Sequence, residues 1–253
     1  MKIGFALSFE KNSMNGTFLS FLYKKYVKFN PYSFTIGHKG AAWNEKKHLN
    51  EIQLAGGEKD ISIIDLNRNI FSITTTGSQH PHQSFLIEQD SGIFHPTNDE
   101  VYEIINWSKT FIAGYLYNEE YTFVQSSESE TLFEHRDISK EILMTLKNTP
   151  YKLGVFDKKK YNTRFNPGRS VLISHTWLMV AWKMWFGEQF FKLVPRERIL
   201  SFPYATEIKE LPSGQVYVQL YDKIEEPHTP DNIFRQWKWR EWLDYDGLEE
   251  KYG

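Results

Sequence analysis

The chain has 253 residues, of which 40% are hydrophobic, 25% are charged and none is cysteine. This composition excludes a disordered or collagen-like chain, and the missing cysteine excludes disulfides, thiolate metal sites and thiol nucleophiles. The formal net charge is −2, so the overall charge predicts no nucleic-acid binding. The length fits one large domain or two small lobes.

The first residues alternate between large apolar and small side chains. The large ones are Ile3, Phe5, Leu7 and Phe9, and the small ones between them are Gly4, Ala6 and Ser8. This period of two predicts a strand with one buried face. The apolar run is too short for a signal peptide, and no stretch approaches the roughly 20 apolar residues of a membrane span. We therefore expect a cytoplasmic protein that contacts no membrane.

The first half of the chain predicts a mixture of strands and helices. In chain order we expect a helix over 18–29, a loop with at most one short element over 37–57, a hairpin of strands over 61–66 and 70–76, and a strand over 84–88. Thr97 and Glu100 have the spacing of a capping box, and the apolar residues behind them predict a helix over 101–115. A strand over 121–125 and a helix over 138–146 follow.

The second half has a different texture. A turn is expected at 166–168, and the stretch 175–193 is apolar on nearly every face, which predicts a buried central helix that carries Trp177, Trp182 and Trp185. Strands over 205–211 and 215–222 form a second hairpin around Pro212-Ser213-Gly214. Asp231 is expected to cap the last helix.

Hairpins and helices therefore interleave without a regular strand-helix-strand rhythm. This order favours an α+β fold with a largely antiparallel sheet and packed helices. We expect a single large domain over residues 1–253 with two lobes, and the clearest candidate for a lobe boundary lies near Pro150.

Charge is spread unevenly along the chain. The segments 117–137 and 241–253 are acidic, and the segment 151–200 between them is basic. Three interpretations remain open: charges that pair in three dimensions, an acidic surface that docks a basic partner, and a basic strip that binds phosphates. The strip would consist of Lys158, Lys159, Lys160, Arg164 and Arg169.

The only closely spaced histidines are His80 and His82, on either side of Pro81. On a strand both rings would point the same way and could share a divalent metal, whereas Pro81 favours a surface loop instead. No third potential metal ligand lies at a sequence spacing that is typical of a metal site. No nucleophile elbow or phosphate-binding glycine pattern occurs in the sequence. We therefore assign no catalytic residue, no metal site and no cofactor.

Trp237 and Trp239 are two residues apart on the expected last helix, so they point in nearly opposite directions. Both cannot face one core, and we expect Trp239 to be the exposed one or to be covered by another loop. An exposed tryptophan beside carboxylates is typical of an interface anchor. The candidate partner-binding residues are Trp239, Trp242, Asp244, Asp246 and Glu249, with Glu128, Glu130 and Glu134 in the other acidic segment.

The same C-terminal stretch carries a family resemblance. The residues that carry it are Val194-Pro195, Ser201-Phe202-Pro203, Leu211-Pro212-Ser213-Gly214, Gln219-Leu220-Tyr221, and Phe234 through Arg240-Glu241-Trp242-Leu243-Asp244-Tyr245. This stretch resembles the immunity proteins of bacterial polymorphic toxin systems, in particular immunity protein family fifty-two. The resemblance covers roughly the last ninety residues. It implies an α+β protein, located in the cytoplasm of the toxin-producing bacterium, that neutralises a secreted toxin of nuclease type.

The sequence therefore leaves three functions open. The first is a non-catalytic binding protein that neutralises a cognate toxin. The second is a metal-dependent hydrolase or phosphodiesterase that uses His80 and His82. The third is a structural or regulatory interaction protein without a toxin. We favour the first, with a protein partner and no enzymatic activity.

Overall fold

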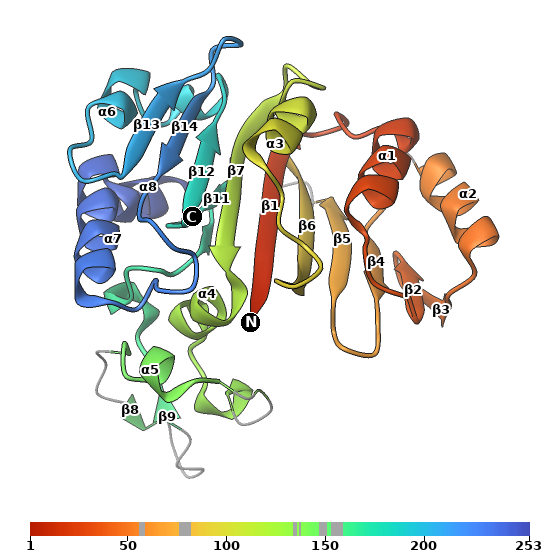
Figure 1. The fold of residues 1–253 in the computed structure, drawn as a ribbon, viewed down its shortest axis with the longest axis horizontal. Helices are drawn as coiled ribbons and strands as arrows, with labels where there is room; N and C mark the ends of the chain where they lie inside the picture. Colours follow the sequence, from red (N-terminus) through yellow and green to blue (C-terminus); the bar gives the residue numbers. More distant parts are fainter. Residues whose placement is uncertain (56–58, 76–81, 134–135, 137, 147–150, 153–158) are drawn as a thin grey trace.

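The computed structural model describes all residues except 56–58, 76–81, 134–135, 137, 147–150 and 153–158. Ten strands form one sheet in the order β13-β14-β12-β7-β1-β6-β5-β4-β2-β3 (Figure 1). The strands of this sheet are β1 Lys2–Glu10, β2 Ser33–Ile36, β3 Lys39–Ala42, β4 Ile61–Ile64, β5 Ile70–Thr75, β6 His82–Asp90, β7 Phe111–Asn118, β12 Lys183–Phe186, β13 Glu207–Glu210 and β14 Val216–Gln219.

Two small hairpins and the helices complete the described structure. The hairpins pair β8 Tyr151–Lys152 with β9 Lys159–Lys160 and β10 Val171–Leu172 with β11 Trp177–Leu178. The helices are α1 Gly16–Tyr26, α2 Glu45–Ala55, α3 Asn98–Ile105, α4 Glu119–Ser126, α5 Lys140–Leu143, α6 Arg196–Leu200, α7 Pro230–Leu243 and α8 Tyr245–Tyr252. Short 3-10 turns cover Glu130–Leu132, Thr163–Phe165 and Phe190–Lys192.

The prediction of an α+β fold with a largely antiparallel sheet is confirmed. Neighbouring strands of the large sheet run antiparallel, and β7 pairs with β12, so strands from both halves of the chain share one sheet. The expected lobe boundary at Pro150 lies outside the described residues. Within the described ranges, none of the helices has the length and apolar character needed to cross a membrane.

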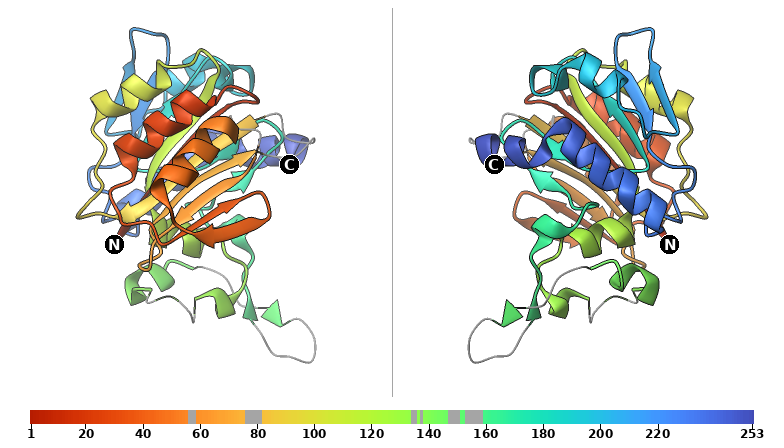
Figure 2. Two further views of the ribbon diagram at one scale, coloured as in Figure 1. Left: turned by 90° about the vertical axis from the view of Figure 1, so that its right-hand side faces the viewer. Right: turned by 90° about the vertical axis from the view of Figure 1, so that its left-hand side faces the viewer.

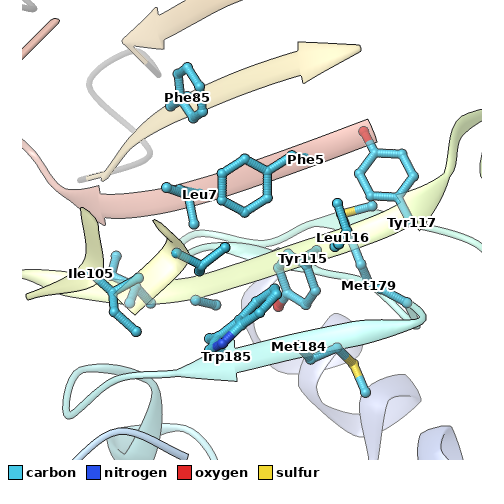
Figure 3. Packing of buried hydrophobic residues seen from close by; sticks show 14 of the residues in the cluster. Phe5, Leu7, Phe85, Ile105, Tyr115, Leu116, Tyr117, Met179, Met184 and Trp185 are labelled. Atoms are coloured by element: carbon cyan, nitrogen blue, oxygen red, sulfur yellow. The ribbon is translucent and has the colours of Figure 1, made fainter. Parts of the chain in front are cut away.

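Helices cover both faces of the sheet. α1 and α2 lie on one face and α7 on the other, while α5 and the β8–β9 hairpin project from one end (Figure 2). The large side chains of β1 point towards α1, and Phe5 lies 6.0 Å from Tyr26 and 6.3 Å from Trp185 between ring centroids. Figure 3 shows Phe5 and Leu7 beside Phe85 and Trp185 in this core. The alternation of large and small residues in β1 therefore places its large side chains on the face that α1 covers.

β1 is covered on its other face as well. Gly4 and Ser8 are buried and Ala6 is half-buried, because α4 and the β10–β11 hairpin lie over this side. The prediction of only one buried face is therefore wrong for this strand. Small residues at these positions leave room above the sheet, and that room forms a cavity described below.

Several predicted elements are confirmed where local chemistry is specific. β4 pairs with β5, and β13 pairs with β14, at the two predicted hairpins. The capping box is present at the start of α3, since the Thr97 hydroxyl accepts from the Glu100 amide at 3.3 Å. The last helix is also confirmed, but it begins at Pro230 with Thr229 as the N-cap in place of Asp231.

Other elements differ from prediction where strands are buried on both faces. The expected helix over 101–115 ends at Ile105, and the rest of its apolar stripe belongs to β7, whose eight residues are all buried. The expected helix over 175–193 is replaced by β11, β12 and a 3-10 turn. A strand covered on both sides has no polar face, so its apolar run cannot be distinguished from a buried helix by periodicity.

Two shorter segments also differ. Residues 121–125 lie in α4, which the Asn118 side chain caps by accepting from the Tyr121 amide at 3.0 Å. The expected loop over 37–57 contains β3 and the whole of α2, a helix that buries only His48 and Ile52. With so few buried positions the helical spacing of α2 is faint in the sequence.

Candidate functional site

Trp239 is fully buried, so of the two expected alternatives, an exposed ring and a ring covered by another part of the chain, the exposed one is wrong. Its ring lies 5.9 Å from Phe186 and 5.0 Å from Phe202 between centroids, and its Nε1 donates to the Tyr245 hydroxyl at 3.1 Å. The spacing of Trp237 and Trp239 showed that one of them faces away from the sheet but could not show which. Here the sheet lies on the side of Trp239, which therefore cannot anchor a partner.

Trp242 is exposed and belongs to a cluster of rings along α7. Phe202 joins its ring to Tyr204, which packs against Phe234. The three exposed residues Trp242, Tyr204 and Phe234, which are 37–44% exposed, are called the α7 aromatic patch here. Buried Phe202 supports the patch, with ring centroids 5.7 Å from Tyr204 and 6.2 Å from Trp242. The Trp242 Nε1 donates to the Arg198 carbonyl at 2.6 Å, which fixes the indole in place.

The charges beside this patch are paired. On α7 itself Asp231 pairs with Arg235 at 2.9 Å, and Lys238 pairs with Glu241 at 2.7 Å. The edge of the patch is therefore polar but close to neutral. Such exposed pairs contribute little to stability, about 0–1 kcal/mol each.

Asp246 and Glu249 pair with arginines of their own chain. Arg169 contacts both carboxylates, and Arg240 contacts Asp246, while these two arginine side chains are only 5% and 2% exposed. Burial and the neighbouring Arg169 lower the pKa of Arg240. The two acids therefore neutralise buried guanidinium groups, and the interpretation of charges that pair in three dimensions holds for them. Asp244 is exposed, at the junction of α7 and α8.

The other predicted acidic segment is less completely described. Glu128 is exposed, Glu130 begins a 3-10 turn, and Glu134 lies outside the described residues. The proposed phosphate-binding strip loses Arg169, which is buried against Glu249, and Lys158 lies outside the described residues. His80 is also undescribed, and His82 is buried on β6. In the ranges that are described, no three His, Asp or Glu side chains are placed to hold a metal ion.

The structure contains a cavity of about 350 Å³ that the sequence did not predict. It lies over the face of β1 that carries Gly4, Ala6 and Ser8, which is called the small face of β1 here. Ala6 forms part of its floor, and α4 and the β10–β11 hairpin supply the opposite wall. The residues that give it shape and polarity are Ala6, Ser84, Leu86, Glu88, Tyr117, Glu119, Phe123, Arg136, Leu172, Trp177 and Met179. The run Gly4, Ala6 and Ser8 was the available signal, since small residues in a strand mark close approach or open space.

One end of this cavity is ionisable. The Tyr117 hydroxyl donates to Glu88 Oε1 at 3.5 Å, and Glu119 forms an ion pair with Arg136, whose guanidinium lies 3.6 Å from the centre of the Phe123 ring. Burial, followed by the nearby Glu119 charge, raises the pKa of Glu88 to about 7. Burial also raises the pKa of Tyr117 well above its usual value, so this hydroxyl stays protonated.

Gly4 sets the position of Tyr117. The tyrosine ring lies against β1 (Figure 3), and a Cβ atom at residue 4 would overlap it. Only glycine therefore lets the Tyr117 hydroxyl approach Glu88 from across the strand. The geometry of the ionisable end thus depends on a residue with no side chain.

Comparison of the chain with known protein families, with curated proteins and with solved structures gave no match. The resemblance to immunity proteins therefore stays a prediction.

Proposed function

We propose that the chain is a non-catalytic protein that neutralises a cognate secreted toxin of nuclease type by stoichiometric binding. The observation that carries the proposal is the α7 aromatic patch, in which exposed Tyr204 and Phe234 pack together and exposed Trp242 is joined to them through buried Phe202. Aromatic rings at a protein surface are the residues most often found to dominate binding energy.

The patch is rigid before a partner arrives. Tyr204 and Phe234 lie edge to face with centroids 5.4 Å apart, and Trp242 is held by its hydrogen bond to Arg198. Rings that are already ordered lose little side-chain entropy on binding. The paired charges of α7 at the edge of the patch match the polar rim of a protein interface.

In this proposal the exposed acidic residues act mainly by speeding the encounter with the toxin. A nuclease grips phosphates with a cationic cleft, so an acidic partner surface accelerates association without adding much affinity. Asp244, Asp246 and Glu128 are exposed acids of the predicted set, and Asp244 and Glu128 are suited to this role. Asp246 and Glu249 are bound to Arg169 and serve the fold.

If a gene beside this chain's own encodes a secreted nuclease domain, the test is the affinity of this chain for that domain, measured by calorimetry. We expect the double variant Phe234→Ser, Trp242→Ser to bind at least about 100-fold more weakly, because each hot-spot ring contributes about 2 kcal/mol or more. Trp107→Ser is the matched control, since Trp107 is 47% exposed but stacks on Phe18 and Phe21 of α1, which covers the other face. Unchanged affinity of the double variant would contradict the proposal.

A further inference from the structure

The cavity over the small face of β1 has the size and lining of a small-molecule site. About 350 Å³ falls within the range of ligand pockets. Its walls are mainly apolar, through Leu86, Phe123, Leu172, Trp177 and Met179. Its ionisable groups Glu88, Glu119 and Arg136 lie together, and hydroxyl side chains supply the rest of the polar lining. Such a lining suits a molecule with an apolar body and one polar head.

The charges at the polar end decide the sign of the ligand. Arg136 is committed to Glu119 and stacks on Phe123. Lys2, the other cation near Glu88, donates to the backbone oxygens of Asn67 and Arg68. Glu88 receives only the long hydrogen bond from Tyr117. Its carboxylate is therefore the group whose charge is least compensated within the described cluster.

We propose that this cavity binds a small amphiphilic organic cation, with its ammonium group on Glu88 and its apolar body between Trp177, Phe123 and Met179. The carboxylates of Glu88 and Glu119 favour the ammonium group, and the apolar lining favours its hydrocarbon body. An anion would meet the carboxylates of Glu88 and Glu119 instead. This site is separate from the α7 aromatic patch and does not depend on the proposed function.

The test is calorimetric binding of three probes that share one apolar body: 2-phenylethylammonium, 2-phenylethanol and 3-phenylpropionate. At pH 8 we expect saturable binding of one cation per chain, with an affinity about tenfold higher than that of the neutral alcohol, equivalent to about 1.4 kcal/mol. The anion should bind most weakly. Equal affinities of the cation and the alcohol, or no saturable binding of the cation, would overturn the proposal.

Two variants place the binding in this cavity. Glu88→Gln keeps the shape of the side chain and should remove the tenfold preference for the cation, while the alcohol binds as before. Ala6→Leu should fill the cavity and weaken both probes, whereas Ala42→Leu on exposed β3 is the matched control. A cation preference that survives in Glu88→Gln would show that another site binds the probe.

The pH dependence adds a readout that simple packing would not produce. The groups that face Glu88 are Glu119, Arg136, Lys2 and Tyr117. Of these groups Glu88 is the one expected to gain charge between pH 6 and 8, since its pKa is about 7. Affinity for the cation should rise across this window and affinity for the alcohol should not. A flat profile for the cation would contradict the role of Glu88.

Discussion

Glu88 makes the stability of the protein depend on pH in a direction opposite to that of most carboxylates. The Glu88→Gln substitution removes its charge while keeping its size and an oxygen for the Tyr117 hydroxyl. In the folded protein the pKa of Glu88 is about 7, against a usual value of 4.5. Between these values the folded state binds more protons than the unfolded state, so the free energy of unfolding falls as pH rises.

The size of the expected change in the free energy of unfolding follows from the difference between the two pKa values of Glu88. The shift of about 2.5 pKa units, 7 minus 4.5, corresponds to about 3 kcal/mol that is lost between pH 4.5 and pH 7. Glu88→Gln should therefore match the wild type near pH 4 and be more stable than it by about 3 kcal/mol at pH 8. Urea unfolding followed by tryptophan fluorescence measures both proteins across the range.

The matched control is Glu141→Gln, which replaces an exposed carboxylate on α5. Its free energy of unfolding should follow that of the wild type within about 0.5 kcal/mol at every pH. A stability difference between Glu88→Gln and the wild type that stays constant from pH 4 to pH 8 would refute the reasoning.

Three further substitutions test the packing, each by urea unfolding. Trp239→Ala should lower the free energy of unfolding by about 3–5 kcal/mol because its ring is fully buried, whereas Trp242→Ala should cost about 1 kcal/mol or less; equal losses would contradict this assignment. Asp246→Lys removes a carboxylate from buried Arg169 and Arg240 and should cost about 1–3 kcal/mol, since Asp246 is itself exposed and Arg169 keeps Glu249, while Glu250→Lys at an exposed position of α8 should cost about 0.5 kcal/mol or less. Gly4→Ala should cost about 3 kcal/mol because its Cβ overlaps the Tyr117 ring, and an unaffected variant would show that the ring can move aside.

The sequence predicted those elements whose local chemistry is specific. The capping box of Thr97 and Glu100 and the hairpin around Pro212-Ser213-Gly214 carry their own hydrogen-bond and turn signals. β7 and β12 were not predicted, because a strand buried on both faces has lost the polar alternation that identifies it. These two missed strands lie inside the sheet, between the predicted strands β14 and β1.

The candidate sites were harder to predict from the sequence for a related reason. The helix spacing limited Trp237 and Trp239 to opposite sides, but only the packing of α7 on the sheet shows that Trp239 is the buried one. Glu88 and Glu119 meet because β6 and α4 flank the small face of β1, and no spacing in the sequence relates them. Gly4 and Ala6 were visible as small residues, but the open space above them depends on what covers the strand.

The most direct test of the account starts from the gene beside this chain's own. If that gene encodes a secreted nuclease domain, the nuclease activity of the domain is titrated with increasing amounts of this chain. Stoichiometric binding predicts that activity falls linearly and reaches zero at one chain per toxin, and that the Phe234→Ser, Trp242→Ser variant shifts or abolishes this end point. Complete inactivation by a small fraction of an equivalent would mean that the chain turns over the toxin, and it would contradict the account.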